Sequence, residues 1–219
     1  FVFVQGDVSE PLVFEKLNEV VGGREALLYI ALSPVLYKDA FEKLVASPLV
    51  THAEKLRLII EKPYGTSGAV AEELNIILYK VFKEEQLYRV DHYLGKDSLT
   101  SLPPIDVTSL QKISVSFLQK EGVEQRVAFY EATGALLDVG QNHMMEMFAL
   151  TLGPTQRAAI VNDLAQLSPE QVAQQTVRSQ WVGYRSLAGV MPDSPVETYF
   201  KIETTWRNIP TTFEGGKYM

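Results

Sequence analysis

Two short apolar runs, each followed directly by polar residues, decide the fold of this sequence: LRLIIEKPYG at residues 56–65 and LYRVDHYLGK at residues 87–96. Two segments have the length and composition of buried strands: Leu56–Glu61 in the first run and Leu87–Val90 in the second. Between them, a long helix is predicted over residues 69–83. A strand, a helix and a second strand in this order indicate neighbouring strands of a parallel sheet.

The same alternation of strands and helices reaches back to the start of the chain. Ser9 is expected to cap a helix that ends at Gly22-Gly23. A buried strand over residues 26–32 follows, and Pro34 opens a further helix. Residues 1–97 are therefore predicted to form a doubly wound, Rossmann-like α/β domain, the C-terminal part of a dinucleotide-binding domain.

The pattern changes after Pro103-Pro104, where alternating apolar runs favour strands with helices between them. A helix over residues 135–152 carries mostly core side chains, and SPEQ at residues 168–171 is typical of a capped helix start. Residues 98–219 are therefore predicted to form an α+β domain with a largely antiparallel sheet. Its predicted strands are residues 112–119, 125–130, 177–183 and 196–207.

The composition excludes several classes of function. The net charge of −7 opposes a broad nucleic-acid surface, and the absence of cysteine excludes disulfides, thiolate nucleophiles and thiolate-bound metals. Three scattered histidines give no ligand set for a metal ion. No run approaches the roughly 20 apolar residues of a membrane span. We expect a cytoplasmic protein with no metal, nucleic-acid or membrane partner.

The polar loops that follow the two strands are the first candidate site. Ligands of open α/β sheets bind beyond the carboxyl ends of the strands, so both loops are expected to face one crevice. His92, Tyr93 and Lys96 could supply three donors to a phosphate, although a solvated turn between a strand and a helix would have the same composition. Lys62 could reach into the crevice or extend outward along its apolar stem.

The second candidate is His143, which ends the polar string DVGQNH at residues 138–143 within an apolar helix. A histidine can act as a general base when a carboxylate orients it, and Asp91 and Asp138 are the candidates for that partner. The alternative is a core histidine held by ordinary hydrogen bonds. His52 has no such supporting residues and is left outside the predicted site.

Three strings occur in one order: EKPYG, then YRVDHYLGK, then GVEQRVAFYEATGALLDVGQNH. Together they resemble the glucose-6-phosphate dehydrogenase family, and DHYLGK is the most specific of them. The resemblance extends over residues 7–217. It implies the first step of the oxidative pentose phosphate pathway, in which hydride passes from C1 of glucose 6-phosphate to NADP and leaves 6-phosphogluconolactone.

The resemblance also implies a role for each matching residue. His143 would be the general base that takes the proton of the C1 hydroxyl, and Asp91 would orient its imidazole. The 6-phosphate would be held by the DHYLGK loop and the sugar hydroxyls by two carboxylates. The implied substrate-binding residues are Lys62, His92, Tyr93, Lys96, Glu124, Asp138 and Lys217. The implied cofactor-binding residues are Ser33, Pro34, Tyr37, Lys62 and Pro63.

Three departures from the family pattern leave alternatives open. The glycine-rich nucleotide turn is absent, the connection between Lys96 and Lys112 is short, and the sequence stops at Met219 before further strands of the family. We therefore expect an interior segment of an enzyme that is a homodimer or homotetramer when complete. The alternatives are a non-catalytic sugar-phosphate-binding relative and a hexose dehydrogenase with relaxed phosphate specificity.

Overall fold

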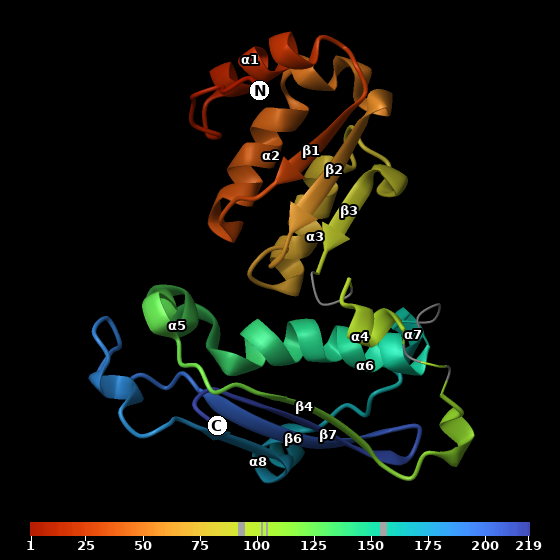
Figure 1. Cartoon of the computed structure of the whole chain (residues 1–219), viewed down its shortest axis with the longest axis vertical. Coiled ribbons are helices and arrows are strands. Elements are labelled where there is room, and N and C mark those ends of the chain that lie inside the picture. Colours follow the sequence, from red (N-terminus) through yellow and green to blue (C-terminus); the bar gives the residue numbers. More distant parts are fainter. Residues whose placement is uncertain (92–94, 102, 104, 154–156) are drawn as a thin grey trace. The chain divides into compact units, whose positions relative to one another are not determined.

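The computed structural model describes residues 1–91, 95–101, 103, 105–153 and 157–219 (Figure 1). They divide into two compact units, Phe1–Asp91 and His92–Met219. Two of the residues predicted to hold a phosphate, His92 and Tyr93, lie outside the described residues.

The first unit alternates helices with three parallel strands, as the sequence predicts. The strand order is β1-β2-β3, and every pairing in this sheet is parallel. Short 3₁₀ turns at Pro34–Leu36, Pro48–Lys55 and Glu84–Gln86 join the larger elements. The strands are β1 (Ala26–Ile30), β2 (Leu56–Glu61) and β3 (Leu87–Val90), and the helices are α1 (Pro11–Val21), α2 (Tyr37–Val45) and α3 (Gly68–Leu78).

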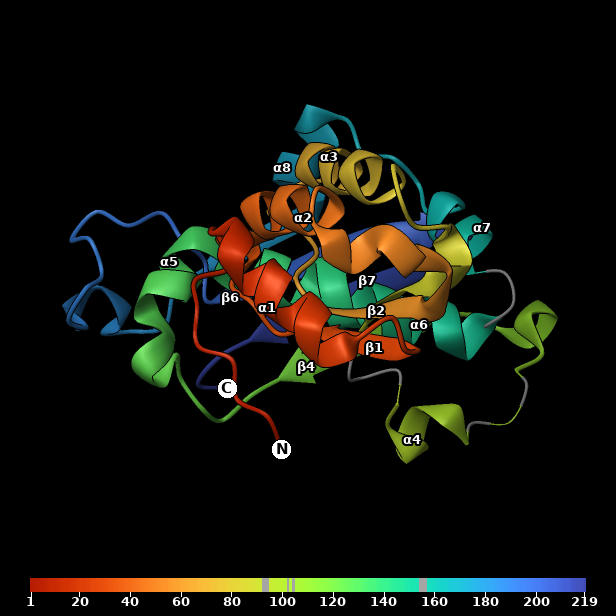
Figure 2. The same ribbon diagram turned by 90° about the horizontal axis from the view of Figure 1, so that it is seen from above.

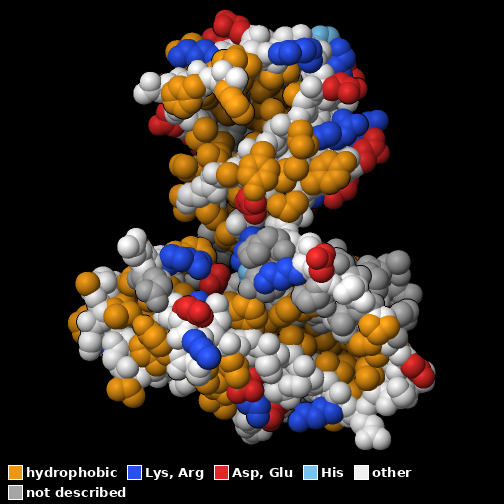
Figure 3. Space-filling view, in the orientation of Figure 1, with side chains coloured by type: hydrophobic (Ala, Val, Ile, Leu, Met, Phe, Trp, Pro, Cys, Tyr) orange, Lys and Arg blue, Asp and Glu red, His pale blue; other side chains and the backbone are white. Residues whose placement is uncertain are grey.

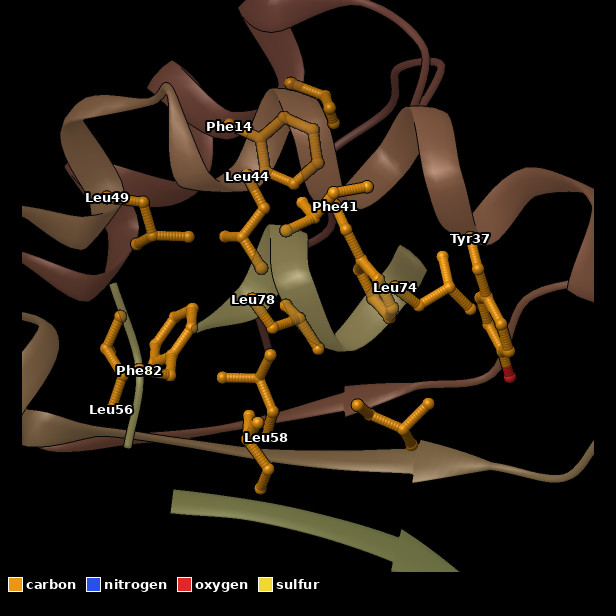
Figure 4. Packing of buried hydrophobic residues seen from close by; sticks show 14 residues of the cluster. Phe14, Tyr37, Phe41, Leu44, Leu49, Leu56, Leu58, Leu74, Leu78 and Phe82 are labelled. Carbon is orange, nitrogen blue, oxygen red and sulfur yellow. The ribbon is translucent and has the colours of Figure 1, made fainter. Parts of the chain in front are cut away.

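The core of the first unit lies between one face of this sheet and its helices. Leu56, Leu58 and Ile60 alternate along β2 and point into the core, as expected for a strand. Figure 4 shows Phe41 and Leu78 packed between the helices and the strands, and Figure 2 shows α2 beside α3 on this face. The opposite face exposes apolar side chains, to which Leu27, Tyr29 and Tyr88 contribute (Figure 3).

The first helix ends as predicted but begins differently. Gly22 adopts a left-handed conformation and donates its N–H to the Asn18 carbonyl, which ends the helix. The prediction that Ser9 caps the helix is wrong, because the N-cap is Glu10, which makes no side-chain cap bond. The Ser9 hydroxyl instead donates to Asp7 Oδ1 in a local turn.

The second unit is a four-stranded sheet with helices. The strand order is β4-β7-β6-β5, in which β4 pairs parallel to β7 and the other pairs are antiparallel, so the prediction of a largely antiparallel sheet is confirmed. Its strands are β4 (Ile113–Leu118), β5 (Thr176–Ser179), β6 (Tyr199–Trp206) and β7 (Ile209–Gly216). Its α-helices are α4 (Asp97–Thr100), α5 (Val127–Ala135), α6 (Met145–Leu152), α7 (Arg157–Asn162) and α8 (Pro169–Gln175).

A nine-residue π-helix, Leu136–Met144, connects α5 to α6, so residues 135–152 are helical as predicted. Figure 1 shows this helical rod crossing one face of the sheet. The backbone of Gly140 lies so close to the Phe200 ring that an added Cβ would come within 2.7 Å of it. The smallest side chain therefore permits the helix to lie directly on β6. The shorter 3₁₀ turns of this unit are Val107–Ser109, Glu124–Arg126 and Tyr184–Ser186.

The predicted strand over residues 125–130 is wrong, because this segment is a 3₁₀ turn that leads into α5. Tyr130 packs edge-on against Tyr184, and Glu131 accepts a hydrogen bond from the hydroxyl of the same tyrosine. Consecutive side chains of a strand point to opposite faces, so a strand could not bring both residues to Tyr184. Short apolar runs are ambiguous in period, and here the tertiary contacts determine the outcome.

The capped helix start at Ser168 is confirmed. The Gln171 N–H donates to Ser168 Oγ at 3.3 Å, and the Ser168 N–H donates to Gln171 Oε1 at 2.9 Å. This reciprocal pair satisfies two backbone donors at the start of α8.

Candidate substrate and cofactor site

The carboxyl edge of the parallel sheet gathers the predicted residues of the first unit. Ile30 pairs with Ile60, and Glu61 pairs with Val90, so the three strands end at one edge. The segments that follow them carry the residues predicted for the cofactor and for orienting the base: Ser33, Pro34, Tyr37, Lys62, Pro63 and Asp91. This is the edge at which open parallel sheets bind ligands.

Tyr37 is hydrogen-bonded to the last residue of β2. Its side chain is completely buried and stacks on Phe41, and its hydroxyl donates to the Glu61 carbonyl at 2.7 Å (Figure 4). Burial, together with the smaller effect of the Glu61 carboxylate, raises the pKa of Tyr37 to about 12. Tyr37 is therefore a neutral donor at ordinary pH, and it fixes the backbone directly before Lys62.

Lys62 and Asp91 follow neighbouring strands directly. The Lys62-Pro63 peptide bond is cis, and both side chains are partly buried. Tyr29 donates a hydrogen bond to Glu61 Oε1, so the carboxylate that precedes Lys62 is also held in place. Lys62 thus follows a residue whose carbonyl and carboxylate both accept hydrogen bonds from tyrosines.

Strand β3 places a second basic residue near this edge. Arg89 donates to Asn75 Oδ1 at 2.6 Å and lies over the Tyr64 ring at 4.9 Å. The Tyr64 hydroxyl donates to the same Asn75 oxygen at 2.9 Å. These contacts join the EKPYG loop to α3 and β3, so the loop after Lys62 is anchored to the rest of the unit.

In the second unit, the π-helix carries Asp138 and His143 as buried residues. Their exposed fractions are 7% and 4%, and the π-helix that carries them also contributes Val139 and Met144 to the hydrophobic core. Buried ionisable side chains are costly unless they are paired or have a function. Their burial therefore places both groups in an environment protected from solvent.

Arg126 lies beside the buried carboxylate of Asp138. Its Nη2 is 3.7 Å from Asp138 Oδ1, and its guanidinium stacks over the Phe129 ring at 4.7 Å. The exposed Arg126 therefore supplies positive charge beside the buried carboxylate of Asp138. The sequence prediction missed Arg126 because it placed residues 125–130 in a strand, where Arg126 and Asp138 have no reason to meet.

Lys217 follows β7 and is also buried, with 7% of its surface exposed. Its N–H donates to the Thr198 carbonyl at 2.9 Å. Two residues earlier, Gly215 packs against Phe200 and lies near Met144 of the π-helix. The π-helix and the end of β7 are thus packed together, which brings the predicted Asp138, His143 and Lys217 to one region of this unit.

Two further predicted substrate residues, Lys96 and Glu124, lie at the starts of short helical turns of the second unit. Lys96 is exposed and directly precedes α4. Glu124 begins the 3₁₀ turn Glu124–Arg126, next to the arginine that meets Asp138. The predicted site residues are thus distributed over both units, Phe1–Asp91 and His92–Met219.

Tyr130 is a buried polar residue that the sequence prediction did not select. Its hydroxyl has no hydrogen-bond partner among the described residues, and burial, followed by the charges of Asp138 and Glu197, raises the pKa of Tyr130. Glu197 was also missed, although its carboxylate is buried beside the start of the π-helix. Contacts between residues this distant in the chain leave no local pattern in a sequence.

Neither a metal centre nor a membrane segment is found in the parts of the chain that the structure describes. No group of three or more His, Asp or Glu residues among them could hold a metal ion. No helix formed by these residues is both long and apolar enough to cross a membrane.

The chain thus combines a Rossmann-like unit, built on a parallel sheet, with a following unit whose mixed, mostly antiparallel sheet is covered by helices. Residues 1–100 match the family model "Glucose-6-phosphate dehydrogenase, NAD binding domain", and residues 103–219 match "Glucose-6-phosphate dehydrogenase, C-terminal domain". The chain therefore belongs to the glucose-6-phosphate dehydrogenase family, which confirms the resemblance seen in the sequence.

Individual relatives agree with this assignment. The chain is 33% identical over 243 residues to glucose-6-phosphate 1-dehydrogenase 1 of Mycobacterium tuberculosis, covering 98% of this chain and 51% of the relative. It is 26% identical over 264 residues to the Bacillus subtilis glucose-6-phosphate 1-dehydrogenase, covering 100% of this chain and 54% of the relative. The chain thus spans about half the length of the curated relatives that it matches.

Solved structures show the same fold. Glucose-6-phosphate 1-dehydrogenase from Mycobacterium avium is 30% identical and superposes with a TM-score of 0.80, covering 98% of this chain and 51% of that one. A glucose-6-phosphate dehydrogenase in complex with glucose 6-phosphate also has a TM-score of 0.80, at 22% identity, covering 98% of this chain and 52% of that one. The second likeness concerns the fold alone.

Proposed function

We propose that this chain forms part of an NADP-dependent glucose-6-phosphate 1-dehydrogenase, which oxidises C1 of glucose 6-phosphate to 6-phosphogluconolactone. The observation that carries the proposal is the π-helix of the second unit, which buries His143 together with Asp138, the partner of Arg126, in a chain of this family. A buried histidine near carboxylates is suited to proton transfer.

His143 has the proposed role of general base. A neutral imidazole can accept the proton of the C1 hydroxyl, and a nearby carboxylate can orient it and stabilise the resulting cation. We assign the orienting role to Asp91 and the binding of sugar hydroxyls to Asp138 and Glu124. Because Asp138 is buried and flanked by Arg126, its carboxylate is held in a fixed position from which it can select hydroxyl geometry.

The phosphate of the substrate is assigned to basic and hydroxyl donors. His92, Tyr93 and Lys96 are proposed to bind the 6-phosphate, and Lys62 and Lys217 to bind the rest of the substrate. Charge-assisted hydrogen bonds to phosphate oxygens are short and strong, so several donors in one loop favour a phosphorylated sugar over a free hexose. This distinguishes the proposal from a hexose dehydrogenase of relaxed phosphate specificity.

The carboxyl edge of the first unit fits a dinucleotide. Ser33, which is exposed, and Pro34, which begins the adjacent turn, lie in the segment after β1. Lys62 and Pro63 lie in the segment after β2. Tyr37, whose hydroxyl is bonded to the Glu61 carbonyl, would shape this edge rather than bond to the cofactor. When bound, NADP supplies the acceptor for the hydride from C1.

We propose that one unit binds the cofactor and the other binds the substrate. Residues 1–97 would belong to the cofactor domain and residues 98–219 to a substrate and dimerisation domain. We further propose a homodimer or homotetramer for the natural protein, which light scattering would determine. The charge of sugar phosphates prevents them from crossing membranes, so we place the activity in the cytoplasm.

The test is an assay of the natural protein with glucose 6-phosphate and either NADP or NAD, in which the absorbance of the reduced nicotinamide is followed. Reduction of NADP with a higher kcat/KM than that of NAD supports the proposal. Calorimetric binding of glucose 6-phosphate without reduction of either cofactor would instead indicate a non-catalytic sugar-phosphate-binding relative. Equal kcat/KM for glucose and glucose 6-phosphate would indicate relaxed specificity and contradict the assignment of the phosphate site.

A further inference from the structure

A buried carboxylate from a distant part of the chain holds the start of the π-helix. Glu197 precedes β6, and its Oε1 accepts the Leu136 N–H at 2.9 Å. Its main-chain carbonyl accepts the Ala135 N–H at 3.1 Å. The first N–H groups of a helix have no partners within the helix, so Glu197 satisfies two donors that would otherwise lack partners.

The surroundings of Glu197 are shaped around this contact. Only 6% of Glu197 is exposed, and its second oxygen accepts a hydrogen bond from Arg178 Nη2 at 2.9 Å. Gly134 leaves the space that the carboxylate occupies, because an added Cβ there would come within 2.4 Å of Glu197 Oε1. One carboxylate thus joins the helix start to β5, and a glycine makes room for it.

The next residue extends the same connection to the end of β7. Thr198 is fully buried, and its carbonyl accepts the Lys217 N–H at 2.9 Å. Its hydroxyl accepts the Trp181 N–H at 2.8 Å, and its own N–H donates to the Ser179 carbonyl. Residues 197 and 198 therefore fix both the helix that carries Asp138 and His143 and the backbone of Lys217.

We propose that Glu197 is a positioning residue for the substrate site, which acts by fixing the start of the helix that carries Asp138 and His143. The inference rests on the proposed function and deepens it, since it assigns a role to a residue that touches neither substrate nor cofactor. The negative carboxylate also suits its place, because helix N-termini carry partial positive charge. Removal of Glu197 leaves the Leu136 N–H without its acceptor and allows the helix start to move.

The expected effect is on turnover and on the titration of the base. Displacements of about 1 Å in a catalytic site can lower rates by roughly 100-fold, so Glu197→Ala should lower kcat by roughly 10- to 100-fold. The apparent pKa in the pH dependence of kcat/KM should shift, because the surroundings of His143 change. The KM for NADP should stay within about twofold, since the cofactor residues belong to the first unit.

Glu197→Gln separates the helix contact from the ion pair. The glutamine keeps an oxygen that can accept the Leu136 N–H, but it has lost the charge that pairs with Arg178. If the helix contact is the important one, Glu197→Gln should recover most of the turnover that Glu197→Ala loses. Equal losses in both variants would show that the ion pair, not the helix contact, matters, and would overturn the proposal.

Glu131→Ala is a matched control for general destabilisation. Glu131 lies in the same unit and its carboxylate accepts hydrogen bonds from Tyr184 and Ser194, yet within the described part of the chain no such bond joins it to the π-helix. Glu131→Ala should lower the melting temperature while keeping kcat and the pH profile. If it lowers kcat as much as Glu197→Ala at equal loss of melting temperature, Glu197 acts only through stability and the proposal fails.

Failure of the proposed function can be told apart from failure of this inference. If the unaltered protein reduces no cofactor, the proposed function fails, and the imidazole signals of His143 in NMR spectra then test the positioning alone. Glu197→Ala should shift these signals and Glu131→Ala should leave them in place. Unshifted His143 signals in a folded Glu197→Ala protein would overturn the positioning role.

Discussion

His143 is buried and ends a polar string on a helix that otherwise contributes to the core, and these two properties distinguish it from His52, the other histidine within the described residues. His52 is exposed and lies 3.6 Å from Glu54 at the surface, far from any predicted site residue in the sequence. The two histidines therefore form a matched pair, one buried within the candidate site and one at the surface of the first unit.

Replacing His143 by alanine should lower kcat by about 100-fold or more, the usual scale for loss of a general base. Binding of glucose 6-phosphate should persist, because the phosphate is assigned to other residues. Steady-state kinetics and calorimetry measure the two effects. His52→Ala should leave both unchanged, and full turnover in His143→Ala would remove the assignment of the base.

Replacing Lys96 by alanine should mainly weaken substrate binding. A charge-assisted contact to phosphate contributes roughly 1.5 to 3 kcal/mol, and the cost should appear in the dissociation constant of glucose 6-phosphate. Lys80, an exposed lysine after α3, provides the control. Unchanged affinity in Lys96→Ala, measured by calorimetry, would show that Lys96 has no contact with the phosphate.

At the level of elements, the junction between α5 and the π-helix depends on Gly134. Its φ of 68° and ψ of 178° interrupt the helical backbone, which turns the chain before the π-helix begins. Side chains other than glycine rarely adopt this conformation, and here an added Cβ would also meet Glu197. The direction of the helix that carries the candidate site is thus set by one backbone position.

Gly134→Ala should therefore destabilise the protein for two reasons at once. Backbone strain of this kind costs about 1 to 3 kcal/mol, and displacement of the Glu197 carboxylate adds to it. Gly183→Ala isolates the first cause, because Gly183 also has a positive φ, of 94°, but nothing lies within 4 Å of its added Cβ. Urea unfolding should show the larger loss for Gly134→Ala, and equal losses would mean that the carboxylate moves aside freely.

The contact between α5 and the loop after β5 should respond to acid. Burial raises the pKa of Glu131, but hydrogen bonds from Tyr184, Ser194 and the Met191 N–H outweigh this effect, so the pKa lies below its ordinary value of 4.5. A carboxylate with a lowered pKa stabilises the folded protein fully above its ordinary pKa of 4.5. This stabilisation is lost as the pH falls below 4.5 and through the lower pKa of the folded protein. The ionised carboxylate thus contributes most at neutral pH.

Glu131→Gln removes this pH-dependent contribution. The difference in the free energy of unfolding between the natural protein and Glu131→Gln should be largest near neutral pH and should shrink as the pH falls below about 4.5. Urea unfolding at a series of pH values measures it. A difference that stays constant with pH would show that Glu131 stabilises the protein through shape rather than charge.

For the whole molecule, the parallel sheet was predictable because local signals agree with the fold. Leu56–Glu61 and Leu87–Val90 form strands with the bounds that their apolar runs indicate. The segment 125–130 was not predictable, since contacts of Tyr130 and Glu131 with Tyr184 override its apparent alternation. Glu197 was invisible for the same reason, because its hydrogen bond to Leu136 joins residues separated by 61 positions. Local sequence patterns predict helices and strands, whereas the contacts that hold the site residues in place join residues far apart in the sequence.

The two units have separate hydrophobic cores, and this arrangement predicts how the molecule responds to a core mutation. Leu58 is fully buried in the core of the first unit, whereas Phe200 is fully buried in the core of the second. Truncation of a buried leucine to alanine costs about 2 to 5 kcal/mol. Because contacts within each core do not depend on the other, Leu58→Ala should destabilise the first unit selectively.

Hydrogen exchange followed by mass spectrometry measures this selectivity, since amides exchange as their own unit opens. Leu58→Ala should speed exchange in β1, β2 and β3 and leave β6 and β7 protected, and Phe200→Ala should do the reverse. The reciprocal pair controls for general damage, because each variant keeps one core intact. If either variant speeds exchange equally in both sheets, the units unfold as one, and a mutation in the cofactor domain would then reach His143 through stability alone.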